Sequence, residues 1–335
     1  MAFRVLLVGG GSGGHVFPLV SVAHALKHHR PDVQVKLMGD GSFVPRAAKE
    51  YGLPYSTIIA PKLRKYEGAP DPLALLKLPF ALAEALWKLF WYMPDAVFAK
   101  GGYTSIMPVL VARLYAIPVY LHESDSVPGL ANRSLAKHAK VVFTAYEKAA
   151  GAFAPYPTVL VGNPVRPGLG GMDAGASRTA FGLSPDKRTV LIIGGSQGAD
   201  QLNKVILEGL VQMVQDGYQL IHLCGEKNYA AVNEQAQKIL AEGAGEYAEA
   251  VKAQYRVYPF LDEKQLAAAY AACDVAVTRA GANLLAELAW VGKPMIIVPL
   301  PGSAQNHQLF NAAEAAKYGN IIIEGVNLTP NILIS

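Results

Sequence analysis

Two glycine-rich turns constrain what this chain can fold into more than any other feature. One occupies residues 9–15 and follows the apolar run 4–8, and the other occupies residues 194–199 and follows the run 190–193. In a doubly wound α/β domain, the first strand ends in such a turn and leads directly into a helix. Because one turn opens each half of the chain, we predict two doubly wound domains that face a shared cleft.

Strand-like and helical segments alternate along both halves, which is typical of parallel α/β sheets. The segment 162–175 is rich in glycine and proline and is expected to connect the domains. The N-terminal domain is therefore predicted over 1–163 and the C-terminal domain over 164–335. Thr329 and Pro330 resemble the start of a helix, which is expected to be short or missing here. The expected strands are 4–8, 34–38, 96–99, 119–122, 141–144, 190–193, 219–223, 255–257, 275–278, 295–298 and 321–323, with a first helix at 17–28.

Composition excludes several classes of protein. With 335 residues, of which 52% are hydrophobic and 17% charged, the chain can bury the cores of two domains. Only two cysteines occur, Cys224 and Cys273, which predicts a reducing compartment and no disulfide framework. The net charge of +4 is too small to indicate nucleic acid, but it suits an anionic substrate or an anionic membrane surface. No apolar run reaches the roughly 18 residues of a membrane-spanning helix, and the N-terminus lacks the pattern of a signal peptide.

Both glycine turns could bind an anion, because glycine lets the backbone approach closely and the next helix offers its N–H groups. The first turn ends in His15, which would crowd a pyrophosphate. A nicotinamide site remains an alternative there, since Asp40 follows the second strand as a ribose-binding acid would. The second turn offers the Ser196 hydroxyl and the Gln197 amide, and is predicted to be the better phosphate site.

An acidic residue in the second half has apolar neighbours. Glu287 lies six residues after Gly281, which opens the helix, and it is surrounded in sequence by leucine and alanine. A carboxylate in such company needs a polar partner, and a ribose diol would supply one. An exposed helical glutamate is the alternative. Polar side chains that suit sugar hydroxyls follow downstream, at Gln305, Asn306, His307, Gln308 and Asn311.

Seven segments together resemble the MurG family, bacterial transferases that add N-acetylglucosamine to a lipid-linked muramyl-pentapeptide in peptidoglycan synthesis. They occur in the order of that family, at residues 10–18, 101–105, 122–133, 162–166, 194–199, 279–287 and 307–312. The resemblance implies two doubly wound, Rossmann-like domains of the glycosyltransferase B type. It also implies inverting transfer from UDP-N-acetylglucosamine to the C4 hydroxyl of undecaprenyl-pyrophosphoryl-N-acetylmuramyl-pentapeptide, which converts lipid I to lipid II at the cytoplasmic face of the plasma membrane.

Site residues follow from the same resemblance. Glu287 would bind the uridine ribose, the backbone of Leu261 the uracil, and Arg166 the phosphates. The remaining donor-binding residues would be Ser196, Gln197, Gly281, Ala282, Gln308 and Asn311. The acceptor would be lined by Ser12, Gly13, Gly14, Tyr103, Glu123 and Asn132.

Two residues are candidates for the general base that deprotonates the acceptor hydroxyl. His15 has an ordinary pKa near 6.5, and the helix N-terminus that follows disfavours its charged form. A base of such pKa is well matched to proton transfer at neutral pH. Asp125 is the rival base or the group that orients the nucleophile.

No metal or cofactor is expected. An Asp-x-Asp motif is absent from the sequence, and the segment most like one is Glu123-Ser124-Asp125. Backbone amides and Arg166 could meet the charge of the leaving group instead, so we predict binding and transfer without a metal.

The segment 71–93 is rich in leucine, phenylalanine and tryptophan. Pro79 and the charged residues Lys77, Glu84 and Lys88 interrupt it. This favours a helix that lies in a membrane interface over one that spans the bilayer. A helix that simply faces the domain core is the alternative. The predicted membrane patch consists of Leu75, Leu76, Phe80 and Trp87, and the protein is predicted to bind the membrane peripherally.

Three other functions remain as alternatives. A transferase of the same fold could use diacylglycerol as the acceptor and keep the same UDP-sugar half. A nicotinamide-dependent oxidoreductase would use the first glycine turn but leaves the second turn and Glu287 without a role. A non-catalytic protein that binds sugar nucleotides is the third.

Overall fold

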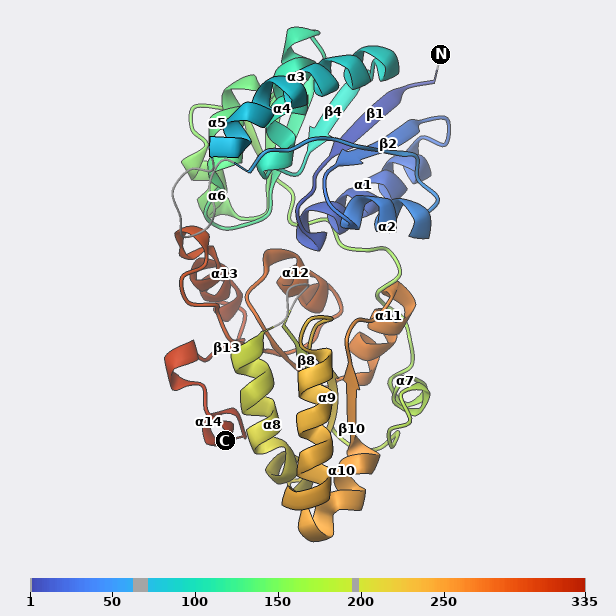
Figure 1. Ribbon diagram of the computed structural model, residues 1–335, viewed down its shortest axis with the longest axis vertical. Coiled ribbons are helices and arrows are strands. Elements are labelled where there is room, and N and C mark those ends of the chain that lie inside the picture. The colour runs from blue at the N-terminus through green and yellow to red at the C-terminus, as the bar shows by residue number, and fades with distance from the viewer. Residues whose placement is uncertain (1, 63–71, 195–198, 335) are drawn as a thin grey trace. The chain divides into compact units, whose positions relative to one another are not determined.

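The structure is a computed structural model that describes residues 2–62, 72–194 and 199–334. The chain divides into two compact units, Met1–Arg166 and Pro167–Ser335 (Figure 1). Each unit contains one parallel sheet with its own helices, as the alternating pattern predicts.

The first unit is built on a seven-stranded parallel sheet of order β3-β2-β1-β4-β5-β6-β7. The order reverses at β1, which pairs with β2 on one side and β4 on the other. Loops at the carboxyl ends of two such strands diverge and leave a crevice where ligands bind in open α/β sheets. The strands are β1 (Arg4–Val8), β2 (Gln34–Gly39), β3 (Tyr55–Thr57), β4 (Ala96–Ala99), β5 (Val119–Glu123), β6 (Val141–Thr144) and β7 (Thr158–Leu160).

Helices cover this sheet, and successive strand residues pack on opposite faces. On β1, Leu6 belongs to one buried cluster with Leu89, and Leu7 belongs to another with Leu19. Because both faces are buried, the central strands are continuous apolar runs. The helices are α1 (Gly13–His29), α2 (Phe43–Glu50), α3 (Pro72–Tyr92), α4 (Ile106–Leu114), α5 (Leu130–Leu135) and α6 (Glu147–Ala152), with 3₁₀ turns at Tyr103–Ser105 and Ala136–His138.

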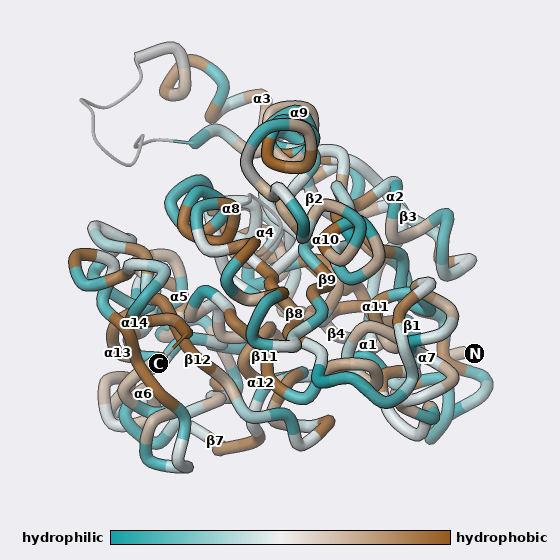
Figure 2. The backbone as a smooth tube through the Cα atoms, turned by 90° about the horizontal axis from the view of Figure 1, so that it is seen from below, coloured by the Kyte–Doolittle hydropathy of each residue, from teal (hydrophilic) through white to brown (hydrophobic). Residues whose placement is uncertain are grey.

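The second unit has a six-stranded parallel sheet of order β10-β9-β8-β11-β12-β13. Its strands are β8 (Thr189–Ile193), β9 (Gln219–Leu223), β10 (Tyr255–Tyr258), β11 (Val275–Thr278), β12 (Met295–Ile297) and β13 (Ile321–Ile322). Strands β8 and β12 are brown in Figure 2, since they are almost wholly apolar. On β8, Ile192 packs with Leu202 and Ile206 of α8 in the core of this unit.

The helices of the second unit follow its strands in alternation. They are α7 (Ala174–Ala180), α8 (Asp200–Gln215), α9 (Tyr229–Lys238), α10 (Ala248–Gln254), α11 (Glu263–Ala272), α12 (Ala282–Trp290), α13 (His307–Ala316) and α14 (Pro330–Ile334), with shorter helical turns at Ile239–Gly243, Gly245–Tyr247, Ala304–Asn306 and Gly325–Asn327. Helix α14 begins at Pro330 as expected, and the Ile332 N–H donates to Thr329 Oγ1 at 3.3 Å.

The predicted strands are all present, but the prediction missed β3 and β7. Each of these strands has three residues and lies at an edge of the first sheet, where one side lacks a neighbouring strand. The prediction was also wrong about the start of the first helix, because α1 begins at Gly13, inside the glycine turn. Among the described residues, no helix combines the length and the apolar character needed to cross a bilayer.

Candidate active site

The first glycine turn is packed against the protein's own polar side chains. A Cβ atom at Gly10 would overlap the carboxylate of Asp40, and one at Gly11, whose φ is +79°, would lie 2.8 Å from the Tyr103 hydroxyl. A Cβ at Gly13 would lie 3.1 Å from the ring of Phe17. These close approaches explain why glycine occupies the turn.

Asp40 is occupied by two hydrogen bonds from within the unit. The Tyr103 hydroxyl donates to Oδ2 at 2.7 Å, and the Thr104 hydroxyl donates to Oδ1 at 2.6 Å. A dinucleotide site needs this carboxylate to accept from a ribose. Because both oxygens of Asp40 accept hydrogen bonds from the protein, the arrangement does not favour the nicotinamide alternative. The Tyr103 hydroxyl lies against the glycine turn and helps to order it.

His15 is the third residue of α1 and is partly buried. Its Nδ1 lies 3.1 Å from Ser12 Oγ, so Ser12 holds the imidazole and does not cap the backbone of the helix. A Cβ at Gly102 would lie 3.5 Å from the ring. Burial lowers the pKa of His15 below its usual 6.5, and Lys100 acts in the same direction, while Asp125, Asp40 and the backbone of Gly10 oppose the shift. His15 is therefore neutral at physiological pH and can accept a proton.

Glu123, at the end of β5, organises the loop that follows it. Its carboxylate accepts from the backbone of Asp125 and of Gly129, both at 3.0 Å, and from Asn132 Nδ2 at 2.9 Å. Burial and the neighbouring Asp125 raise the pKa of Glu123, while these hydrogen bonds oppose the rise. Glu123 and Asn132 are thus buried supports of the loop that carries Asp125, which is itself partly exposed.

Asn132 also brings α5 against the turn after β4. Its Nδ2 donates to the His122 carbonyl at 3.1 Å, and a Cβ at Gly101 would lie 2.6 Å from its amide. Asn132 Oδ1 is buried and has no hydrogen-bond partner within the described structure. A ligand hydroxyl or a water molecule would satisfy this acceptor.

Sequence reasoning missed Lys100, which is buried at the carboxyl end of β4. Its Nζ lies 2.8 Å from His122 Nδ1 and 3.3 Å from Asn163 Oδ1. The sequence does contain a signal, because a lysine directly follows the apolar run of a parallel strand. Arg166, also in the first unit, places its guanidinium 5.4 Å from the ring centroid of Phe17.

In the second unit, Glu287 on α12 is buried and held by a residue that the sequence did not indicate. The Tyr270 hydroxyl, on α11, donates to Glu287 Oε2 at 2.8 Å, and Tyr270 is wholly buried. Glu287 is therefore not the exposed helical glutamate of the alternative interpretation.

Gly281 is the N-cap of α12, with φ −72° and ψ 123°, and Ala282 is the buried first residue of that helix. A Cβ at Gly281 would meet no atom of the described residues within 4 Å. Neither the backbone conformation nor packing against the described part of the unit therefore requires glycine here. Close approach of a ligand to the helix N-terminus would require it.

Three further residues that were predicted to bind the donor are buried or make hydrogen bonds within the second unit. Leu261 is buried and precedes α11, whose N-cap Asp262 accepts from the Gln265 backbone at 2.8 Å. Gln308 Oε1 accepts from the Leu300 backbone at 2.9 Å, which ties α13 to the loop after β12. Asn311 is wholly buried, and its Nδ2 donates to the Ala280 carbonyl at 3.2 Å, directly before Gly281.

Two residues before α13 have strained backbones. Gln305 and Asn306 have φ values of 53° and 55°, in the left-handed region. Non-glycine residues adopt this region at an energetic cost, and such strain is concentrated at functional sites. Ser196 and Gln197, the predicted phosphate contacts, lie outside the described residues.

Helix α3 has one buried and one exposed apolar face. Ala81, Ala85 and Leu89 face the core. The predicted membrane patch lies on the exposed face, where Leu75 is 53% exposed, Leu76 68%, Phe80 68% and Trp87 65%. The rings of Trp87 and Trp91 pack edge to face there, with their centroids 5.5 Å apart. The interpretation as a core-facing helix therefore holds for one face of α3, and the membrane patch on the other face stays a prediction.

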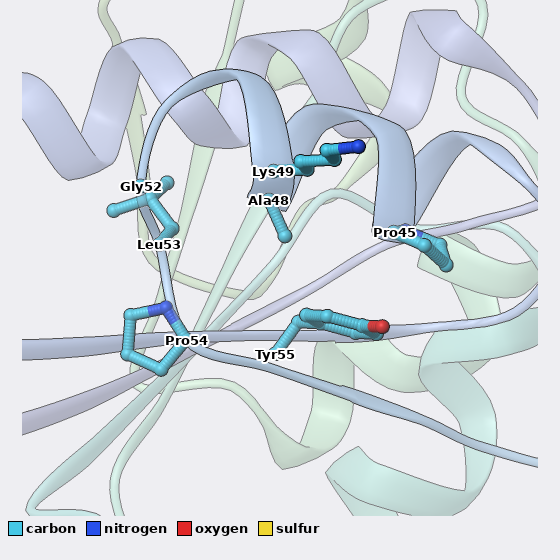
Figure 3. Close-up of a pocket in the computed structure, with 7 residues that line it drawn as sticks. All are labelled: Pro45, Ala48, Lys49, Gly52, Leu53, Pro54 and Tyr55. Atoms are coloured by element: carbon cyan, nitrogen blue, oxygen red, sulfur yellow. The ribbon is translucent and has the colours of Figure 1, made fainter.

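A hollow beside α2 lies away from these groups. It is lined by Pro45, Ala48, Lys49, Gly52, Leu53, Pro54 and Tyr55 (Figure 3). The loop 51–54 precedes β3, so the hollow lies at the amino ends of parallel strands, whereas ligands bind at their carboxyl ends. In the described part of the chain, no group of three or more histidine, cysteine, aspartate or glutamate side chains is arranged to hold a metal ion.

Known proteins are similar to this chain over nearly its whole length. The N-terminal domain of glycosyltransferase family 28 matches residues 5–144, and its C-terminal domain matches residues 189–335. A UDP-N-acetylglucosamine--N-acetylmuramyl-(pentapeptide) pyrophosphoryl-undecaprenol N-acetylglucosamine transferase of Desulfotalea psychrophila is 36% identical over 324 residues, which are 96% of this chain and 83% of that protein. A protein of the same name from Moorella thermoacetica is 36% identical over 329 residues, covering 96% and 85%.

The solved structures give the same result. The crystal structure of Acinetobacter baumannii MurG is similar with a TM-score of 0.69 and 29% identity, covering 99% of this chain and 88% of that one. The predicted fold class, two doubly wound α/β units of the glycosyltransferase B type, is confirmed.

Proposed function

The chain belongs to glycosyltransferase family 28 and, within it, to the MurG family, and we propose that it transfers N-acetylglucosamine from UDP-N-acetylglucosamine to the C4 hydroxyl of undecaprenyl-pyrophosphoryl-N-acetylmuramyl-pentapeptide. The observation that carries the donor half of this proposal is the pair of Gly281 and Glu287 on α12. A helix N-terminus that could bind a phosphate and a buried carboxylate that could bind a ribose diol lie on one helix.

We propose that residues 164–335 form the UDP-sugar domain on the donor side; this range comprises the second unit and the three residues that precede it. Glu287 would accept hydrogen bonds from the ribose, the backbone of Leu261 would contact the uracil, and Gly281 and Ala282 would face the diphosphate. Asn311 supports this role indirectly, since it fixes the carbonyl of Ala280 next to Gly281. Gln308, Ser196, Gln197 and Arg166 complete the proposed donor set.

The acceptor side is proposed to lie in the first unit, with residues 1–163 as the acceptor- and membrane-binding domain. In an inverting transfer the acceptor hydroxyl attacks the anomeric carbon from the face opposite to UDP, and it loses its proton late in the step. His15 is the proposed base, because it is neutral and oriented by Ser12. Asp125, on the loop that Glu123 holds, is the proposed orienting group and the rival base. Gly13, Gly14, Tyr103 and Asn132 complete this side.

We propose that the reaction needs no metal ion. In place of a metal, the N–H groups at the start of α12 and the guanidinium of Arg166 would stabilise the charge that develops on the departing UDP. Titration with UDP-N-acetylglucosamine in excess EDTA tests this directly. Unchanged affinity is expected, and loss of binding that magnesium restores would contradict it.

We propose that the protein works at the cytoplasmic face of the plasma membrane and binds it peripherally. The exposed face of α3 supports this, because leucine, phenylalanine and tryptophan side chains along one helix suit the interface of a bilayer. Such a face would bring the acceptor side to a substrate whose polyprenyl chain stays in the membrane.

Calorimetric titration with UDP-N-acetylglucosamine, UDP-glucose and NADH tests the donor assignment. Binding of UDP-N-acetylglucosamine in preference to UDP-glucose, with no binding of NADH, is the expected result. Preference for NADH would contradict the proposal and restore the nicotinamide alternative.

A further inference from the structure

A buried lysine stands in the proposed acceptor side and has no part in the chemistry described above. Lys100 is only 2% exposed. An ammonium group that leaves water must be compensated by hydrogen bonds and by opposite charge. The contacts of Lys100 show what provides this compensation, and they lead to both candidate bases.

The hydrogen bonds around Lys100 fix the state of His122. Its Nε2 lies 2.9 Å from the Gly162 carbonyl, which can only accept, so Nε2 carries the proton. In a neutral imidazole Nδ1 is then an acceptor, and it faces Lys100 Nζ at 2.8 Å. His122 is thus a neutral acceptor for the lysine. Burial, assisted by Lys100, lowers the pKa of His122 well below 6.5.

A second contact connects Lys100 to the loop of Asp125. Lys100 Nζ donates to Asn163 Oδ1 at 3.3 Å, which turns Asn163 Nδ2 toward the Ser124 carbonyl at 3.1 Å. Asp125 follows Ser124, and its own N–H is held by Glu123. The lysine therefore helps to hold the Asp125 loop through the amide of Asn163.

The charged groups that act on Lys100 come from the strand and loop beside it. Burial lowers the pKa of Lys100 to about 7, while the carboxylates of Glu123 and Asp125 oppose this shift. The ammonium in turn lowers the pKa of His15, which Asp125 and Asp40 raise. The charge of Lys100 thus acts on His15.

We propose that Lys100 is a positioning residue of the acceptor side, which holds the Asp125 loop through Asn163 and whose charge acts on His15. The catalytic part of this inference rests on the proposed function.

Two variants separate the charge of Lys100 from its hydrogen bond. Lys100→Met removes the charge and both contacts, so the pKa of His15 should rise. The acid limb of the pH profile of kcat should then move upward, by on the order of one pH unit. Asn163→Ala removes the connection to Ser124 but keeps the charge, so kcat should fall while the acid limb stays in place. An acid limb at the wild-type position in Lys100→Met would contradict the proposal.

A measurement without substrates distinguishes this proposal from the proposed function. NMR titration of the His15 ring, assigned with His15→Gln, should give a higher pKa in Lys100→Met than in the wild type. Lys100→Gln, also neutral, should behave alike and serves if the methionine variant does not fold. An unchanged His15 pKa in a folded neutral variant overturns the role of the charge. A raised pKa in a protein without transferase activity supports that role and contradicts the proposed reaction instead.

Discussion

The hydroxyl of Tyr270 donates a hydrogen bond of 2.8 Å to Oε2 of Glu287, and the two side chains are buried together between α11 and α12. A hydrogen bond to a buried carboxylate fixes its rotation as well as stabilising its charge. This hydrogen bond fixes the orientation of the carboxylate that we propose as the ribose-binding group.

Tyr270→Phe should weaken donor binding without removing the carboxylate. A hydrogen bond to a charged group contributes about 1.5–3 kcal/mol, so the KM for UDP-N-acetylglucosamine should rise by about tenfold or more. Steady-state kinetics with the wild type and the variant measure this change.

A nucleotide that lacks a ribose hydroxyl provides the control for Tyr270→Phe. If Tyr270 acts by orienting Glu287 toward the ribose, the substitution should affect 2′-deoxy-UDP much less than UDP. Equal losses for both ligands would mean that Tyr270 does not act through the ribose contact.

Gly281→Ala should leave the unit stable and impair the donor site. The backbone of Gly281 is in a region that alanine adopts readily, and the added methyl group would meet no atom of residues 2–62, 72–194 or 199–334 within 4 Å. A phosphate at this helix N-terminus would meet it. We expect an unchanged melting temperature and a donor affinity reduced by about tenfold or more. Unchanged donor affinity in this variant would rule out close approach of the phosphate at Gly281.

His15→Ala and Asp125→Asn should separate the two candidate bases. Loss of a general base lowers kcat by about 10²–10⁴-fold, and we expect this loss for His15→Ala with little change in donor KM. Because the pKa of His15 is lowered from 6.5, the wild-type kcat should stay constant above that pH and fall only below it. A profile that loses its acid limb in Asp125→Asn but keeps it in His15→Ala would assign the base to Asp125.

The second unit should lose stability in mild acid through His222. This buried imidazole contacts the Tyr255 hydroxyl at 2.8 Å and Asn203 Oδ1 at 3.0 Å, and burial lowers its pKa to about 3. Below pH 6.5 the unfolded chain therefore binds a proton that the folded chain does not bind. The free energy of unfolding should fall with decreasing pH, by up to about 1.4 kcal/mol per pH unit for this group.

His222→Gln is the matched variant for this prediction. Between about pH 5 and 6.5, where carboxylates remain ionised, the slope of unfolding free energy against pH should be smaller in the variant by about one proton. Parallel slopes from urea unfolding would show that His222 is not the group responsible.

Serine at Leu76, Phe80 and Trp87 should weaken membrane binding and spare the fold. These side chains are 65–68% exposed, so their loss removes little core packing. Fully burying each one in an interface is worth about 1.5–3 kcal/mol. Sedimentation with anionic liposomes should show strong loss for the triple variant. Val326→Ser, which removes an exposed apolar residue of the second unit, should bind as the wild type does, and equal binding by both variants would contradict the membrane role of α3.

The sequence predicts the frame of the molecule well, because buried parallel strands are continuous apolar runs. Strands β1 and β8 are examples, and both lead into glycine turns. Strands β3 and β7 could not be found in this way, since each has only three residues, fewer than the apolar run of a buried central strand. The first helix was placed too late because glycine was read as turn only, although Gly13 begins α1.

Candidate site residues could be predicted where they lie within short motifs. His15 was predicted from its place at the end of the first glycine turn, and Glu287 from its apolar neighbours in the helix after Gly281. Tyr270 and Lys100 were not, because their partners depend on the packing of separate elements. Lys100 and Asn163 are 63 positions apart in the sequence, and only the parallel sheet brings the ends of their segments together.

Product analysis tests the central claim most directly. The full chain is incubated with UDP-N-acetylglucosamine and either a polyprenyl-pyrophosphoryl-muramyl-pentapeptide or diacylglycerol, and the product is characterised by mass spectrometry and NMR. We predict a single added N-acetylglucosamine on the muramyl acceptor, joined through its C4 hydroxyl with a β configuration, because inversion of the α-linked donor gives β. Glycosylated diacylglycerol, or no transfer to the muramyl acceptor by a protein that binds the donor, would contradict the account.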